Sequence, residues 1–213
     1  MAAAQQTTQA GAAGRDHAPT HEDSCDGAGD QPPDPGAHPD PDAGPVRRSG
    51  GVVVSIDDAA DALDPDALTW LRNALLRAVE SALALEGADA DAPHEVRVRI
   101  VGDDEMGALH GAHTGDPATT DVLTFDLRDE NAGPLDVDIV ICADEAARQA
   151  AERTRPAERE LLLYALHGVL HCLGHDDHDD EAYARMHARE DEVLSKIGVG
   201  ALFADPADRE GAQ

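Results

Sequence analysis

Residues 167–178 read HGVLHCLGHDDH and combine four histidines and two aspartates with apolar residues. The apolar run that starts near Pro156 predicts a helix that ends at Gly174. His167 and His171 lie four residues apart, so such a helix projects both rings from one face, about one turn apart. That geometry suits two ligands of one tetrahedral ion, and the apolar residues of the same helix would sink it into the core.

A loop residue is expected to complete the site. Gly174 permits a left-handed backbone conformation and stops the helix. The chain then turns back, so the loop HDDH (175–178) can supply a third ligand. Three protein ligands leave one coordination position for water, as in catalytic zinc sites. Ordinary helix histidines are the alternative, but the spacing and the ligand-rich loop together favour a metal site.

The pattern is similar to the HExxH motif of zinc metalloproteases and differs from it at one decisive position. Gly168 stands where HExxH carries the glutamate that acts as general base. Without that carboxylate a peptidase lacks its usual means of activating zinc-bound water. The sequence therefore disfavours a protease.

Composition divides the chain into one domain and two tails. Residues 1–48 hold seven of the 13 prolines and lack Leu, Ile, Phe, Trp and Tyr, so they cannot bury enough apolar surface to offset the entropy of ordering. We expect a disordered acidic tail rich in Pro, Gly and Ala over 1–48, a domain over 49–200 and a flexible C-terminal tail over 201–213. The chain shows neither a signal peptide nor a run as long as a membrane span, so a soluble, cytoplasmic protein is expected.

The charge is strongly negative. The formal net charge is −28, and the 1–48 tail, with three basic and eight acidic residues, contributes −5 of it. The remaining −23 lies on residues 49–213, where Lys196 is the only lysine of the chain. Such a surface repels polyanions in general. The same charge is also typical of an acidic proteome at high ionic strength, where salt screens the repulsion between like charges.

Hydrophobic periodicity predicts four strands and five helices. The strands are expected at 52–56, 94–102, 119–127 and 135–143, and the helices at 64–87, 103–111, 143–153, 156–174 and 180–197. Asp64 can cap the first helix and Pro65 fits its first turn. Cys142 and Cys172 lie in apolar runs, and an odd cysteine count of three argues against a disulfide framework. The fold class is therefore α+β with α/β-type layers: a small four-stranded mixed sheet packed with helices, one of them a zincin-like metal helix.

Three stretches resemble one known family. HGVLHCLG (167–174) resembles the HGxLHLxGYDH signature of the YbeY family of rRNA-processing endoribonucleases. TTDVLTFDL (119–127) is similar to that family's PTDVLSF strand, and LDVDIVICADEAARQA (135–150) to its LGDIVIS-helix segment. The last helix follows the family's pattern at Met186, Glu190, Val193, Leu194 and Gly198.

The resemblance implies a function. It implies a zinc-dependent endoribonuclease directed at single strands, with one Zn²⁺ per chain, that matures the 3′ end of small-subunit (16S) rRNA and takes part in ribosome quality control. The implied partners are single-stranded rRNA and the small ribosomal subunit with its assembly factors.

The third ligand has two candidates. In strict register with the family's motif its third histidine falls on Asp177, and His178 lies one residue further on. Aspartate is an acceptable zinc ligand, so Asp177 closes the site without a shift. His178 would preserve the family's three-nitrogen site, with Asp177 as its support. We expect His167, His171 and His178 as ligands, with Asp177 as the in-register alternative.

A second departure concerns phosphate handling. The family usually has a YR pair upstream of the TDVL strand, and its arginine is thought to handle phosphate. Aligned on Asp121, those positions are His113 and Thr114, and a threonine cannot neutralise developing negative charge. His113 and Asp121 are candidates for a catalytic role, against a surface role for His113 and a structural one for Asp121. The arginines that could compensate are Arg128, Arg148, Arg153, Arg155 and Arg159, for which a solvated helix face is the alternative.

The expected mechanism is metal-assisted phosphodiester cleavage. The ion would polarise a phosphoryl oxygen and lower the pKa of its bound water to roughly 7. Whether that water or the ribose 2′-hydroxyl attacks stays open. The chain has one Trp, two Tyr and two Phe, so stacking platforms are few and the ribosome is expected to supply much of the positioning. The alternatives are a zinc hydrolase of another class, such as a peptidase, and a ribosome-associated binding module with structural zinc.

Overall fold

The computed structural model describes residues 46–203 apart from residue 90. Most of the predicted N-terminal tail, and residues 204–213 of the predicted C-terminal tail, lie outside the described residues. Within the described part of the chain, no helix is long and apolar enough to cross a membrane.

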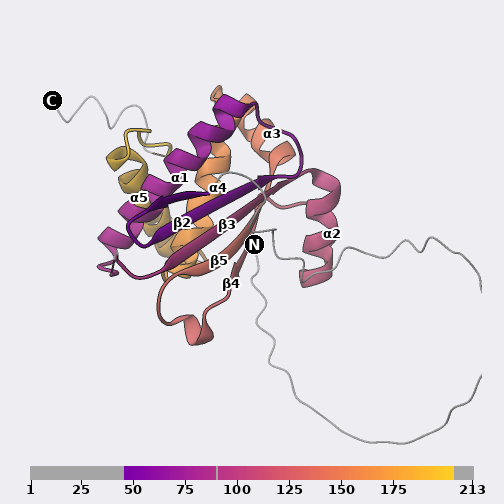
Figure 1. Ribbon diagram of the computed structural model, residues 1–213. Helices are drawn as coiled ribbons and strands as arrows, with labels where there is room; N and C mark the ends of the chain where they lie inside the picture. Colours follow the sequence, from indigo (N-terminus) through magenta and orange to yellow (C-terminus); the bar gives the residue numbers. More distant parts are fainter. Residues whose placement is uncertain (1–45, 90, 204–213) are drawn as a thin grey trace, which may run out of the picture. The chain divides into compact units, whose positions relative to one another are not determined.

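A five-stranded mixed sheet forms the centre of the domain, in the order β1-β2-β3-β5-β4 (Figure 1). The strands are β1 (Arg47–Ser49), β2 (Val52–Asp58), β3 (His94–Val101), β4 (Val122–Asp126) and β5 (Asp136–Cys142). The three inner strands are parallel, and β1 and β4 run antiparallel at the two edges. Helices connect the parallel strands, as a parallel sheet requires.

Strand β1 was not predicted, and it raises the number of strands from four to five. Its three residues carry no apolar side chain, so periodicity gives no signal. It forms because Gly50 and Gly51 turn the chain back, with Gly50 at φ 53°, and pair Arg48 with Val53. A two-residue Gly-Gly loop is a hairpin signal that the periodicity argument passed over. The predicted domain start at residue 49 therefore falls inside β1.

The predicted helices are confirmed. They are α1 (Pro65–Leu85), α2 (Asp103–Thr114), α3 (Ala143–Arg153), α4 (Ala157–Cys172) and α5 (Asp180–Lys196). Asp64 caps α1 as expected, since its Oδ1 accepts hydrogen bonds from the backbone of Asp66 and Ala67. A short 3₁₀ turn, η1 (Asp129–Asn131), links β4 to β5. Cys142 and Cys172 are free, buried and half-buried respectively.

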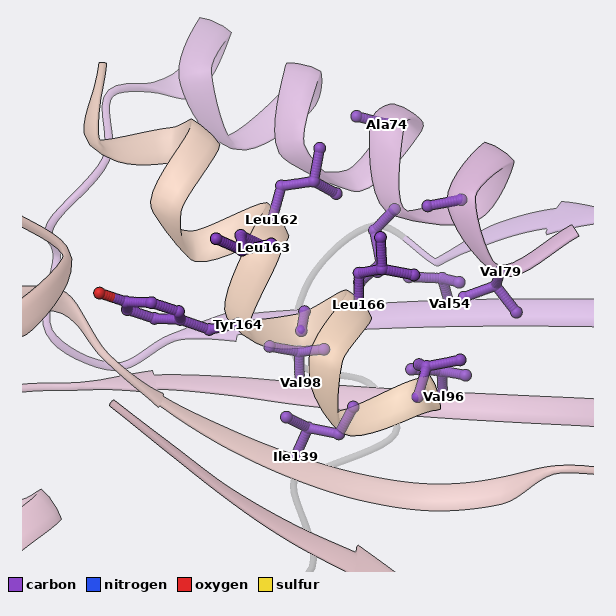
Figure 2. Packing of buried hydrophobic residues seen from close by; sticks show 14 of the residues in the cluster. Val54, Ala74, Val79, Val96, Val98, Ile139, Leu162, Leu163, Tyr164 and Leu166 are labelled. Atoms are coloured by element: carbon purple, nitrogen blue, oxygen red, sulfur yellow. The ribbon is translucent and has the colours of Figure 1, made fainter. Parts of the chain in front are cut away.

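Helices α1 and α4 cover one face of the sheet, and α5 packs against both of them (Figure 1). In Figure 2, Leu162 and Leu166 of α4 lie among Val79 of α1 and the strand residues Val96 and Ile139. All of these side chains are at most 1% exposed. Helix α2 packs on the opposite face through a smaller cluster of Met106, Leu109, Val101, Leu123, Phe125, Val140 and Cys142. The alternation of inward and outward residues in each strand thus produces two apolar layers.

Helix α4 passes over β4 and β5 at very short range. A Cβ atom added at Gly168 would lie 2.5 Å from Thr124 Oγ1 and 3.2 Å from Ile139 Cδ1. Only glycine fits this approach, so the residue after His167 carries no side chain for a packing reason. The same contact fixes the height of His167 and His171 above the edge of the sheet.

We predict that Gly168→Ala lowers the free energy of unfolding by about 1–3 kcal/mol, because the added methyl group overpacks the α4–sheet contact. Gly111→Ala is the matched control: it is also a helical glycine, but its nearest neighbour would be Pro117 Cα at 3.4 Å. There the better helix propensity of alanine should leave stability unchanged or raise it by up to about 1 kcal/mol. Urea unfolding of both variants measures the difference, and equal effects would contradict the close approach.

Candidate metal centre

His167 and His171 lie on the flank of α4 that is not packed against the sheet, and their side chains are 19% and 31% exposed. Their Nε2 atoms are 2.9 Å apart, and the ring planes are perpendicular with centroids 4.4 Å apart. Two imidazoles on one tetrahedral ion, with metal–nitrogen distances near 2.0–2.1 Å, have nitrogens about 3.3 Å apart. The pair therefore already has nearly the separation that a shared ion requires.

The hydrogen bonds of the two δ-nitrogens determine which atoms face one another. His167 Nδ1 lies 2.8 Å from Glu190 Oε1, and His171 Nδ1 lies 3.0 Å from the carbonyl oxygen of His175. Both partners are acceptors, so both δ-nitrogens carry the proton. In the neutral rings the two Nε2 lone pairs then point at one another. This arrangement is repulsive unless a cation, either a proton or a metal ion, lies between them.

Asp177 adds a third acceptor to this point. Gly174 ends α4 at φ 96°, and the amide of His175 donates back to the carbonyl of Leu170 at 3.0 Å. The turn brings Asp177 Oδ2 to 3.7 Å from His167 Nε2 and Oδ1 to 3.8 Å from His171 Nε2. Ligand atoms of all three residues lie within 4.8 Å of one another, and the carboxylate is 16% exposed. His167, His171 and Asp177 form the candidate metal centre.

His178, the residue expected to close the site, does not join this group. Its side chain is 54% exposed, and its Nδ1 is hydrogen-bonded to Asp176. It lies 3.9 Å from Asp177 Oδ1, in a second, more exposed group with the two aspartates. The in-register alternative is thus the residue that the loop directs toward the histidine pair. The short return after Gly174 aims the third position of the loop inward and the fourth outward.

Glu190 of α5 supports His167. Its side chain is 1% exposed, and its two oxygens bond His167 Nδ1 at 2.8 Å and His187 Nδ1 at 2.6 Å. Burial lowers the pKa of His167, but the hydrogen bond and charge of Glu190 outweigh it and the net pKa is raised. In the sequence Glu190 matches the family's pattern in the last helix, a match that assigns it no role. The signal was available: a carboxylate on the same helix face as the buried Met186 and Val193 needs a partner.

The pKa of His171 shifts in the opposite direction. Burial, and then the neighbouring charge of His167, lower its pKa below the usual value. The two pKa values therefore shift apart, and His167 binds a proton more readily than His171. A metal ion that replaces this proton meets two neutral imidazole nitrogens and one carboxylate.

The other two catalytic candidates are not members of this group, although the charge of Asp121 contributes to the raised pKa of His167. Asp121 Oδ1 accepts hydrogen bonds from the Val122 amide and the Thr120 hydroxyl, which is the structural role considered for it. The ring of His113 lies against that of Phe125, with the two ring centroids 4.8 Å apart. Phe125 belongs to the cluster under α2, whereas Thr124, the residue before it, faces α4. His113 and the candidate metal centre are thus on opposite faces of β4.

Thr114 does not replace the arginine of the family's YR pair. Its hydroxyl donates to the carbonyl of His110 at 2.8 Å and closes the last turn of α2. Among the arginines, Arg148 pairs with Asp103 and Glu145, and both Arg153 and Arg155 pair with the buried Glu160. Arg128 is different, because its guanidinium reaches the carbonyl of Cys172, the residue after His171.

The fold and this group define a class: an α+β protein whose central buried helix carries a candidate His-His-Asp metal centre and has no room for the glutamate of a peptidase. Residues 50–198 match the family described as Endoribonuclease YbeY. The chain belongs to the YbeY endoribonuclease family.

Individual relatives match the chain over most of their length. An Endoribonuclease YbeY of Alkaliphilus oremlandii is 39% identical over 151 residues, which are 68% of this chain and 96% of the relative. Those of Macrococcus caseolyticus and Methylibium petroleiphilum are 36% and 40% identical, over 70% and 63% of this chain and 96% and 82% of the relatives. The family likeness expected from the three sequence stretches is confirmed.

We predict that Glu190→Gln weakens zinc binding about 10–100-fold, because the amide loses the negative charge that holds His167 Nδ1–H. Glu192→Gln is the control on the same helix, since that carboxylate is 44% exposed and pairs only with Arg189 and Lys196 among the described residues. Competition with a chromogenic chelator gives both dissociation constants. Equal affinities in the two variants would refute the supporting role of Glu190.

Proposed function

We propose that this protein is a zinc-dependent endoribonuclease of single-stranded RNA that acts in 3′ maturation of 16S rRNA and in ribosome quality control. The single observation that carries the metal-dependent part is the convergence of His167 Nε2, His171 Nε2 and the Asp177 carboxylate on one point. The family membership supports the RNA substrate.

The donor set favours zinc. Two imidazole nitrogens and one carboxylate suit Zn²⁺, whereas Mg²⁺ and Ca²⁺ prefer oxygen ligands only. We assign His167, His171 and Asp177 as the three protein ligands and one ion per chain. A bound Zn²⁺ supplies Lewis-acid polarisation of a phosphoryl oxygen and a lowered pKa of water at the fourth position.

The chain's own residues orient this centre and restrict its chemistry. Glu190 fixes the ring of His167, and the carbonyl of His175 fixes that of His171. The close contact of Gly168 with Thr124 leaves no space for a general base at that position, which argues against peptide hydrolysis.

The acidic surface bears on the substrate. A formal net charge of −28 opposes binding of free RNA at long range. We therefore propose the small ribosomal subunit and its assembly factors as the partners that hold the single-stranded rRNA against the site. Activity on naked RNA should accordingly be weak and should rise with ionic strength up to the point at which direct phosphate contacts are screened.

We predict that Asp177→Ala lowers cleavage of a labelled single-stranded RNA at least about 100-fold and abolishes one-to-one zinc binding, since it removes a ligand. His178→Ala is the matched control one residue away and should retain both properties within about 3-fold, because its ring turns outward. EDTA should silence the wild type and added zinc should restore it.

Three outcomes would contradict this. If His178→Ala lost zinc while Asp177→Ala kept it, the ligand assignment would be wrong. If all proteins and the EDTA-treated sample cut equally, the activity would come from a contaminant. If zinc bound one to one and no protein cut either free RNA or small subunits, the binding-module alternative would replace the nuclease.

A further inference from the structure

A pocket of about 320 Å³ lies beside the candidate metal centre, at the C-terminal end of α4. His171 belongs to both, so an occupant of the pocket adjoins one of the three candidate metal ligands. Leu83 and Leu135, each 1% exposed, lie beneath it, and the half-buried Ala88 and Leu173 supply its apolar surface. The volume is at the lower end of the range of small-ligand pockets, so the pocket holds one small group.

Arg128 is the polar group that this pocket presents. Its side chain is 8% exposed and is held by Asp126, whose Oδ1 accepts from Nε at 2.9 Å and whose Oδ2 lies 2.5 Å from Nη2. Nη2 also donates to the carbonyl of Cys172. The guanidinium is thus fixed in orientation to both β4 and the end of the metal helix.

The Nη1 edge of the Arg128 guanidinium is not used by these contacts. Arginine has five N–H groups, and the contacts with Asp126 and Cys172 use those of Nε and Nη2. Nη1 makes no hydrogen bond to any part of the chain that the structure describes. Because Arg128 lines the pocket, its two Nη1 donors are available to an anionic oxygen there.

The other polar side chains of the pocket are already bonded. The buried imidazole of His94 accepts from the Leu135 amide at 2.9 Å and bonds the Asp89 carbonyl at 2.8 Å. The Glu86 carboxylate makes both of its contacts through Oε1, with His175 at 3.0 Å and Arg189 at 3.2 Å. Arg128 is therefore the permanent cation of this lining, and it is the group against which an occupant would place an anion.

We propose that this pocket binds the nucleotide next to the cleaved phosphodiester, with its phosphate on Arg128 Nη1 and its base or sugar against Ala88 and Leu173. The inference rests on the proposed function and adds a substrate subsite to it. It gives the chain a phosphate-binding arginine where Thr114 offers none. Asp126 serves as a positioning residue, since it holds the guanidinium in place before substrate arrives.

The test begins with a short RNA in which the bond cleaved by the zinc-loaded wild-type protein has been mapped. In Arg128→Gln we expect KM to rise about 10-fold, the loss of one charged hydrogen-bonded contact, with kcat within about 3-fold. Arg148→Gln removes the same charge from an exposed site on α3 and should leave KM unchanged. Zinc stoichiometry and Tm, measured for each variant, report any structural damage.

Replacing one charged phosphate of the RNA by a neutral group tests whether Arg128 contacts that phosphate. In the same RNA one phosphate at a time beside the cleaved bond is replaced by methylphosphonate. The wild type should lose about 10-fold in KM for one of these substrates, and Arg128→Gln should show no such penalty. A penalty that persists in Arg128→Gln, or an equal KM for the Arg128 and Arg148 variants, would overturn the subsite.

Failure of the proposed function is distinguishable. If the wild type does not cleave, the dissociation constant of a 2′-O-methyl oligonucleotide with zinc-loaded protein replaces KM as the readout. Weaker binding of about 10-fold in Arg128→Gln alone would still support the subsite, and equal binding by the wild type and the two variants would overturn it.

Discussion

The close approach of α4 to β4 and β5 at Gly168 is the constraint on which the rest of the structure depends. It buries the apolar side of the helix, with Leu166 and Val169 fully enclosed, and leaves a partly exposed flank beside them. His167 and His171 occupy that flank. The glycine between them therefore does two things: it sets the position of the imidazoles, and it excludes the side chain that would make this motif a peptidase motif.

The polar groups that surround the two histidines come from α5 and from the loop after α4. Glu190 of α5 and the carbonyl of His175 each take one δ-nitrogen, which turns both Nε2 lone pairs to a common point. Asp177 then faces that point from the loop after Gly174. Two lone pairs and one carboxylate that face a common point favour a cation there. The metal-dependent chemistry proposed for the chain follows from this charge balance.

Much of this could be predicted from the sequence, because local rules control it. The helices, the four apolar strands and the pair at i and i+4 follow from periodicity and from capping by Asp64. Strand β1 lacks apolar residues and depends on a Gly-Gly hairpin. Between Asp177 and His178 the choice depends on how tightly the loop returns, which no spacing rule states.

Local sequence rules do not predict contacts between residues that are far apart in the chain. Glu190 meets His167 from 23 residues away, and Arg128 meets Cys172 from 44 residues away. Each of these contacts is made only when two helices, or a strand and a helix, have docked. Both place a charged group against α4 from another element, and both are absent from a reading of the HGVLHCLGHDDH stretch alone. The support of the metal centre is thus tertiary, whereas its two histidine ligands are local.

Anomalous diffraction at the zinc edge from crystals of the zinc-loaded protein tests the central claim most directly. The account predicts one anomalous peak per chain, about 2.0–2.2 Å from His167 Nε2, His171 Nε2 and an Asp177 oxygen, with His178 turned away. A peak bonded to the ring of His178, with Asp177 outside the coordination sphere, would contradict it. So would the absence of any peak beside the two α4 histidines.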